Sequence, residues 1–212
     1  VNVNVDAASV APTSASVDTP TYCDDAAPAT IQLSFAGGSL GTGAIARWYD
    51  DAGLTNNVGN GNNLSLAAPA ATTTYFVRFE GTCPPPTAAQ SVTVTVDNAS
   101  VAPTSASSDF TTYCDNALPG GGITLTYAGG SLGTGATAEW YDDAAFTSSV
   151  GSGNSLLINP APSVSTTYFV RFEGTCGNTA AQSVNVNVDA ASVAPTSAAV
   201  DTPTYCDDAA PA

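Results

Sequence analysis

The residues with the most obvious potential for chemistry form two copies of a Gly-x-Ser-x-Gly pattern, at 37–41 and 129–133. This pattern marks a nucleophilic serine when the serine sits on a strand-to-helix turn and a histidine acts as its base. The chain contains no histidine, and we find no stretch with a helical period to supply the helix. We therefore expect both glycine-rich stretches to be turns between strands, and we predict that the chain is not an enzyme.

Aspartate is the second candidate for chemistry, because it recurs at fixed places. Adjacent pairs stand at 24–25, 50–51, 142–143 and 207–208, and single residues at Asp6, Asp97 and Asp189. Calcium takes six to eight oxygen ligands, and the single residues could supply some of them. Aspartate also forms turns by bonding to its own backbone. Calcium at Asp6, Asp97 and Asp189 and simple turn formation both remain open, and no other cofactor is expected.

Five cysteines complete the reactive groups, at Cys23, Cys83, Cys114, Cys176 and Cys206. Regularly spaced cysteines in an acidic chain without lysine are typical of a disulfide framework made in an oxidising compartment. One regular pairing joins Cys23 to Cys83 and Cys114 to Cys176, and the other joins Cys83 to Cys114 and Cys176 to Cys206. The loop entropies of the two pairings differ by only about 0.6 kcal/mol, so they do not decide.

The charge balance excludes several classes of partner. The chain has 18 acidic and three basic residues, for a net charge of −15. Nucleic acids and anionic membrane surfaces both require a basic surface. No apolar run reaches the roughly 18 residues of a membrane span. Hydrophobic residues make up 43% of the chain, which is enough for packed cores. We therefore expect a folded protein with no nucleic-acid partner and no membrane insertion.

The chain is a repeat, and the repeat sets its domain organisation. Residues 1–29 and 184–212 are identical except that Ser16 is replaced by Ala199. A weaker similarity recurs at half that distance, so two unlike units alternate. We expect the sequence to be a window on a longer array. The predicted parts are the last strand of a preceding unit (1–5), unit A (6–96), unit B (97–188) and the start of the next unit A (189–212).

Alternating apolar residues predict β-strands throughout. Ile31, Leu33 and Phe35 alternate with polar residues, and Tyr75, Val77 and Phe79 follow the same rule. Gly-rich and Asn-rich turns separate such runs. About seven short strands per unit favour a two-sheet sandwich. The predicted fold class is all-β, with tandem β-sandwich domains, and the short junctions predict a stiff string.

The order of features within each unit resembles a known family. A cysteine is followed by a Gly-rich hairpin, a Trp-Tyr pair, a Thr-Thr-Tyr-Phe-Val strand, a second cysteine and a last strand with alternating valines. This order, over 23–96 and 114–188, resembles the Ig-like repeats of large secreted and surface adhesins of Bacteroidota. The resemblance implies that the chain is all-β with tandem Ig-like β-sandwich domains, which are extracellular, have an adhesive or structural role and carry no catalytic residues. It also favours cysteine pairing within units, Cys23 with Cys83 and Cys114 with Cys176.

Alternation also predicts an outward face on which the three arginines gather. Two neighbouring strands of each unit place these residues side by side: Arg47, Tyr49, Phe76 and Arg78 in unit A, and Glu139, Tyr141, Phe169 and Arg171 in unit B. A position that is Arg47 in one unit and Glu139 in the other suits a contact between unlike units. We hypothesise that this face, with its phenylalanines and tyrosines exposed, is a lateral contact. The alternative is a solvated face on which Glu139 pairs with Arg171.

The predicted function is structural. We expect an extracellular or cell-surface repeat protein that forms a stiff filament or an adhesin stalk and associates with itself. Any surface or glycan ligand would then lie outside these residues. The alternative is an array of carbohydrate-binding accessory modules of a secreted enzyme, which would need coplanar exposed aromatic rings in each unit.

Overall fold

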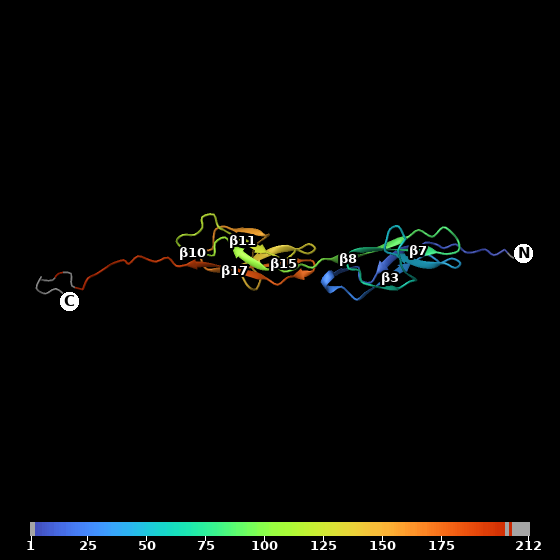
Figure 1. Ribbon diagram of the computed structural model, residues 1–212, viewed down its shortest axis with the longest axis horizontal. Helices are drawn as coiled ribbons and strands as arrows, with labels where there is room; N and C mark the ends of the chain where they lie inside the picture. The colour runs from blue at the N-terminus through green and yellow to red at the C-terminus, as the bar shows by residue number, and fades with distance from the viewer. Residues whose placement is uncertain (1–2, 202–203, 205–212) are drawn as a thin grey trace.

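The computed structural model describes residues 3–201 and 204, and its regular elements are strands apart from one short 3-10 helix, η1 (Asp24–Ala26). The strands form two β-sandwich units that lie end to end along one axis (Figure 1). This confirms the predicted all-β class and the tandem sandwiches. None of the residues described forms a helix with the length and apolar character to cross a membrane.

Unit A contains eight strands in two sheets. The smaller sheet has the order β1-β3-β6 and the larger one the order β2-β8-β7-β4-β5. The strands are β1 (Ser14–Val17), β2 (Thr21–Cys23), β3 (Thr30–Ala36), β4 (Ile45–Tyr49), β5 (Asn57–Asn60), β6 (Leu64–Ala67), β7 (Thr73–Glu80) and β8 (Gln90–Asp97). All pairs are antiparallel except β2 with β8, which run parallel.

Unit B repeats this plan. Its sheets have the orders β9-β11-β14 and β10-β17-β15-β12-β13, with the two-residue β16 paired to β15. The strands are β9 (Ser105–Ser108), β10 (Thr112–Cys114), β11 (Ile123–Ala128), β12 (Thr137–Tyr141), β13 (Ser149–Ser152), β14 (Ser155–Ile158), β15 (Thr166–Gly174), β16 (Gly177–Asn178) and β17 (Gln182–Asp189). Here β10 is the strand that runs parallel to its neighbour, β17.

Each unit has its own core, built from the alternating residues that the sequence predicted to face inward. Ile31 and Leu33 of β3 are fully buried and pack with Trp48, Val77 and residues of β8. The indole N–H of Trp48 donates to the Gly61 carbonyl at 3.0 Å, so the ring is buried without an unpaired donor. Unit B repeats these contacts around Trp140. The two cores share no residue, so each unit buries its own apolar surface.

The Gly-x-Ser-x-Gly stretches form turns, as predicted. Gly37 and Gly38 have φ of +72° and +71°, and a side chain at Gly38 would place its Cβ 2.5 Å from the Ala11 carbonyl oxygen. Ser39 forms a β-bridge with Val10 and exchanges backbone hydrogen bonds with it. The serine is therefore part of a packed backbone turn, and no strand-to-helix elbow is present at this place.

The strand predicted for residues 1–5 differs from what the structure contains. Residues 3–5 lie outside any strand, and residues 1–2 fall outside the described residues. The same sequence at 184–188 belongs to β17, which is held by β15 and β10. Within the described residues, no strand lies beside 3–5 to hydrogen-bond with it, and an alternating pattern alone does not satisfy the backbone groups of a strand.

We predict that Leu33→Ala lowers the free energy of unfolding of unit A by about 2–5 kcal/mol, because a fully buried side chain leaves a cavity. Leu40→Ala is the matched control, since Leu40 is 50% exposed, and its effect should stay within about 0.5 kcal/mol. Denaturant unfolding followed by tryptophan fluorescence measures both. Equal losses for the two variants would contradict the assigned core.

Candidate functional site

A disulfide joins the two units. Cys23 of unit A is bonded to Cys176 of unit B, 153 residues further along the chain, and their Cα atoms are 5.7 Å apart. Cys23 is the last residue of β2, and Cys176 lies in the turn between β15 and β16. Cys83 and Cys114 carry free thiols, while Cys206 lies outside the described residues. The most distinctive chemistry of the chain is thus located at the junction between units.

The predicted pairing within units is wrong, and strand direction explains why. Because β2 runs parallel to β8, Cys23 lies beside Asp97 at the far end of β8. Cys83 follows β7 and lies beyond Gln90, at the opposite end of β8. Seven residue steps of strand separate these ends by about 23 Å, whereas disulfide-bonded Cα atoms lie within about 7 Å.

The other predicted pairing also differs from the structure. Cys176 is bonded to Cys23, so it does not pair with Cys206. Cys83 lies at the outer end of unit A, and Cys114 lies beside Asp189 at the outer end of unit B. Two whole units therefore separate Cys83 from Cys114 (Figure 1).

Hydrogen bonds hold the same junction. The amide of Ala99, in the first segment of unit B, donates to the Asp24 carboxylate of unit A at 2.8 Å. The chain leaves β8 at Asp97, and at the next residue the Asn98 amide already donates to Thr134 Oγ1 of unit B at 2.8 Å. No linker separates the units. A hollow of about 210 Å³ at this junction is lined by Asp25 of unit A and by residues of unit B around Cys176.

Two of the paired aspartates are turn formers, as one of the two interpretations expected. Asp51 accepts hydrogen bonds from the Thr55 amide and hydroxyl and from the Asn56 amide. Asp143 does the same in unit B with Thr147 and Ser148. The backbone donors at Asn56 and Ser148 lower the pKa of the two carboxyl groups. These carboxylates therefore stabilise the turn that follows β4 or β12.

The single aspartates at the junctions act through their backbone. The thiol of Cys83 donates to the Asp6 carbonyl at 3.4 Å, and the bonded sulfur of Cys176 lies 3.6 Å from the Asp97 carbonyl. Asp189 pairs with Cys114 in the sheet. Among residues 3–201 and 204, no three acidic, cysteine or histidine side chains gather as a metal-binding group. Calcium at Asp6, Asp97 and Asp189 stays a prediction, which melting in excess chelator would test.

In unit A, the strands pair in the register that the sequence predicted for the outward face. The side chains on that face are less exposed than predicted. Arg47 of β4 lies directly opposite Arg78 of β7. Both arginines approach Glu80, Arg78 through a 2.6 Å hydrogen bond and Arg47 at 3.1 Å without hydrogen-bond geometry. Tyr49 also donates its hydroxyl to Glu80. Although burial alone would raise it, the pKa of Glu80 is lowered, because Tyr49 and Arg78 bond to its charged form.

The same face of unit B carries one more aromatic ring. Arg171 bonds to Glu173 at 2.7 Å and not to Glu139, although Glu139 lies opposite it across the strands. The guanidinium of Arg171 lies 4.1 Å from the ring centroid of Phe146, a cation–π contact. The hydrogen bond from Tyr141 is the main cause that lowers the pKa of Glu173. The predicted Glu139–Arg171 pair is thus replaced by a pair within β15.

The tyrosines predicted to be exposed are buried. Tyr49 and Tyr141 are 5% and 7% exposed, because an arginine covers each ring and a glutamate holds each hydroxyl. Phe76 and Phe169, beside them in the sheet, are half-buried. The net charge of this face differs in sign between the two units. Unit A presents two arginines and one glutamate on this face, and unit B presents one arginine and two glutamates.

Comparison with known proteins assigns the family. A model described as "Ig-like domain CHU_C associated" matches residues 10–97 and 101–189, and the chain belongs to this family. The predicted resemblance to Ig-like repeats of Bacteroidota is thereby confirmed. Among curated proteins, no sequence matches the chain. Domains of this fold are typically non-catalytic.

Several solved structures match the chain at low identity. A crystal structure of murine CEACAM1b is 14% identical and covers 84% of this chain and 99% of its own, with a TM-score of 0.48. A Dscam structure is 19% identical and covers 86% of this chain and 47% of its own, with a TM-score of 0.45. Fibronectin(III)-like modules of CbhA from Clostridium thermocellum are 13% identical over 83% of this chain and 94% of theirs, with a TM-score of 0.36.

Sequence reasoning missed two groups that shape the site. Asp24 was treated only as one of the paired aspartates, although it bonds to the next unit. The sequence carried no signal for this contact, because only the Cys23–Cys176 bond seen in the structure places the residue after Cys23 at the junction. Phe146 was not singled out. The available signal was the position of Phe146 in the turn after the Trp-Tyr pair, where unit A has Leu54. The structure confirms that the two positions match, with φ of 55° at Leu54 and 56° at Phe146.

We predict that Cys176→Ser frees the junction without unfolding either unit, because each core is independent. Small-angle X-ray scattering should then show a broader distribution of interdomain angles, while tryptophan fluorescence stays native. Cys83→Ser is the matched control, since Cys83 occupies the equivalent position and has a free thiol. The prediction fails if both variants scatter like the parent chain.

We predict that Asp143→Ala lowers the melting temperature at pH 7 by a few degrees and that this loss vanishes in acid. The pKa of Asp143 is lowered in the folded state, so its contribution is present above the unfolded value of about 3.9 and is lost as the pH falls through the lower folded value. Circular dichroism melts at pH 7 and pH 2.5 measure this. Asp142→Ala is the control, because only its backbone bonds to the turn, and an equal effect would contradict the assignment.

Proposed function

We propose that the chain is a stretch of an extracellular or cell-surface structural protein, a stiff string of Ig-like units that forms a filament or an adhesin stalk. The observation that carries this proposal is the Cys23–Cys176 bond, which joins one unit to the next. A disulfide that merely stabilised a small domain would lie within that domain. One that crosses a junction adds nothing to either core and instead restricts how the units move.

The junction geometry supports stiffness. The backbone crosses from Asp97 to Asn98, and the disulfide crosses beside it from Cys23, which is paired with Asp97 in adjacent strands about 4.8 Å apart. Because the backbone and the disulfide both connect the two units, the units cannot rotate freely against each other. The Asp24–Ala99 hydrogen bond adds a third contact. The units consequently extend along one axis, which gives the string length for few residues (Figure 1).

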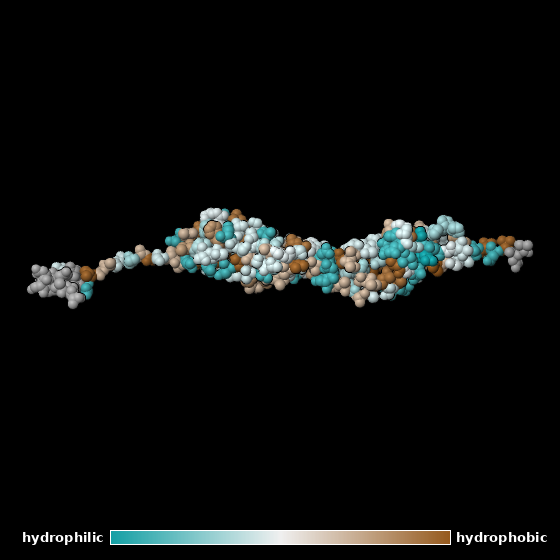
Figure 2. Space-filling view, in the orientation of Figure 1, coloured by the Kyte–Doolittle hydropathy of each residue, from teal (hydrophilic) through white to brown (hydrophobic). Residues whose placement is uncertain are grey.

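The chemistry of the chain supports an extracellular location. A disulfide persists in oxidising environments and is rare where thiols are kept reduced. The surface is mostly hydrophilic or neutral in Figure 2, with scattered apolar patches, and the net charge of −15 limits non-specific association. These properties suit a long surface structure. We further propose that the units are not catalytic, because neither Ser39 nor Ser131 lies on a strand-to-helix turn and the chain has no histidine to act as a base.

The alternative of a carbohydrate-binding array is less well supported. Sugar rings stack on exposed aromatic faces, but Trp48, Trp140, Tyr49 and Tyr141 are all buried. Several other aromatic rings are accessible only in part, and Phe110 is 45% exposed. The half-buried rings of Phe146 and Phe169 adjoin each other but meet edge to face, with 77° between their planes, so they form no flat platform and we do not favour this function.

We also propose that the arginine-bearing faces make the lateral contacts of a filament or bundle. The face of unit A carries two arginines, Arg47 and Arg78, against the single Glu80, which leaves an excess positive charge. The face of unit B carries Glu139 at the same place. An unlike pair of units would bring these side chains together, whereas two like units would repel. Strings in half-period register would then attract one another.

The stalk proposal predicts straight particles. Negative-stain electron microscopy of longer arrays should show rods whose length grows in proportion to the number of units, with a narrow distribution of bend angles. Compact or randomly bent particles under oxidising conditions would contradict the proposal.

The lateral proposal predicts that Arg47→Glu raises the protein concentration needed for bundling by about tenfold, or about 1.4 kcal/mol, because two glutamates would then meet. The control is the double variant Thr30→Glu, Gln32→Glu, which changes the net charge equally on the exposed positions of β3. Light scattering measures bundling, and melting curves report the fold. Equal effects of the two variants would assign the result to net charge alone.

A further inference from the structure

We propose that Cys83 and Cys114 each form a disulfide with a neighbouring unit, at junctions built like the one that Cys23 and Cys176 close. Cys83 would bond to the first cysteine of a preceding unit, and Cys114 to the second cysteine of a following unit. Each unit would then be linked covalently to both neighbours. The inference rests on the proposed string and specifies its partner at each end. That partner is a further Ig-like unit whose facing end, which we call its pole, carries the matching cysteine.

The end of unit A that carries Cys83 shares several contacts with the bonded end of unit B, although three prolines (84–86) follow Cys83 where the two residues of β16 follow Cys176. Cys83 lies against the Asp6 carbonyl at 3.4 Å, as Cys176 lies against that of Asp97 at 3.6 Å. The Ala7 amide donates to Thr42 Oγ1 at 2.9 Å, and its counterpart in unit B is the 2.8 Å bond from Asn98 to Thr134. The surroundings that present Cys176 to unit A are thus already built around Cys83.

The hollows beside the two cysteines match as well. Around Cys83, a hollow of about 350 Å³ is lined by Ala8, Ser9, Ala11, the three prolines 84–86, Thr87 and Ala88. Around Cys176, a hollow of about 210 Å³ is lined by the matching residues Ala99, Ser100, Ala102, Thr179 and Ala180, by Gly177 and Asn178 in place of the prolines, and by Asp25 of the preceding unit. The hollow at Cys83 is therefore the surface on which a Cys-Asp segment of a preceding unit fits.

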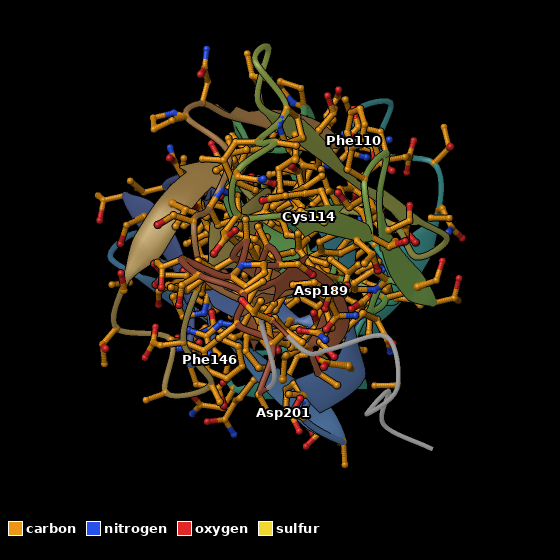
Figure 3. The ribbon with its side chains drawn as sticks, turned by 90° about the vertical axis from the view of Figure 1, so that its left-hand side faces the viewer. Phe110, Cys114, Phe146, Asp189 and Asp201 are labelled. Atoms are coloured by element: carbon orange, nitrogen blue, oxygen red, sulfur yellow. A yellow bond between two sulfur atoms is a disulfide. The ribbon has the colours of Figure 1, made fainter. Side chains whose placement is uncertain are left out.

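The opposite pole, on unit B, is prepared in the same way. Cys114 is exposed and pairs with Asp189 at the end of β17, as Cys23 pairs with Asp97. Figure 3 looks along the long axis at this end, and both labelled residues lie near the centre of the view. The Asp115 carboxylate accepts the Ala191 amide at 2.9 Å. This is the counterpart of the Asp24–Ala99 bond at the closed joint.

The sequence identifies the partner at this pole. Residues 189–201 repeat 6–18 except that Ser16 is replaced by Ala199, so the segment lying on Asp115 is the start of an A-type unit. The cysteine that such a unit presents at its near pole is the one equivalent to Cys83. The joint between unit B and a following unit A is therefore a Cys114–Cys83 bond.

The bond forms by thiol–disulfide exchange with a small disulfide such as oxidised glutathione. One protein thiolate attacks the small disulfide and releases one reduced molecule. The second protein thiolate then displaces the other, so the two protein thiols lose two protons and two electrons in all. The electrons end on two molecules of reduced glutathione.

The test uses the full chain with residues 6–188 repeated once in register, so that an A-type unit follows unit B. The protein is oxidised in a glutathione buffer, digested without reduction after aromatic residues, and mapped by mass spectrometry. We expect a peptide that links Cys114 of the first copy to Cys83 of the second, together with Cys23–Cys176 in both copies.

Cys114→Ala in the first copy is the matched variant, and it should leave Cys83 of the second copy as a thiol while both Cys23–Cys176 bonds persist. The inference is overturned if Cys114 and that Cys83 both remain thiols beside intact Cys23–Cys176 bonds, or if Cys83 pairs elsewhere. Straight rods without the new bond would overturn this inference alone and leave the string intact. Flexible particles that contain the bond would instead overturn the string.

Discussion

The parallel pairing of β2 with β8 determines how the units can be joined. It places the first cysteine of a unit at the end where the chain leaves, while the hairpin after β7 or β15 places the second cysteine at the end where the chain enters. A disulfide tolerates only a short separation of Cα atoms. The two cysteines of one unit therefore cannot meet, and each can reach only a neighbouring unit.

This constraint links chemistry to mechanics. Each sandwich has an independent core, so the joint is free to serve the geometry of the array instead of the stability of a domain. In the proposed array, every added unit brings one cysteine at the end where the chain enters and one at the end where it leaves, so it can be joined to both neighbours. In the proposed lateral contact, the exchange of Arg47 for Glu139 gives alternate units opposite net charge on the same surface.

Much of the fold was predictable because its signals are local. Strict alternation in β3 and β7 predicted which residues are buried, and neighbouring strands placed Arg47 beside Arg78. The disulfide was not predictable in this way, because alternation does not reveal which end of the long axis a short strand such as β2 occupies. Tyr49 was misjudged for a related reason. Facing outward from the sheet does not keep a ring exposed when Arg78 and Glu80 cover it.

The central claim is that the disulfides form between units and not within a unit. Peptide mapping of the unmodified chain under non-reducing conditions tests it most directly, because Tyr22 and Phe172 allow cleavage close to Cys23 and Cys176. The account predicts one linked peptide pair that contains Cys23 and Cys176. Peptides that link Cys23 to Cys83, or Cys114 to Cys176, would contradict it.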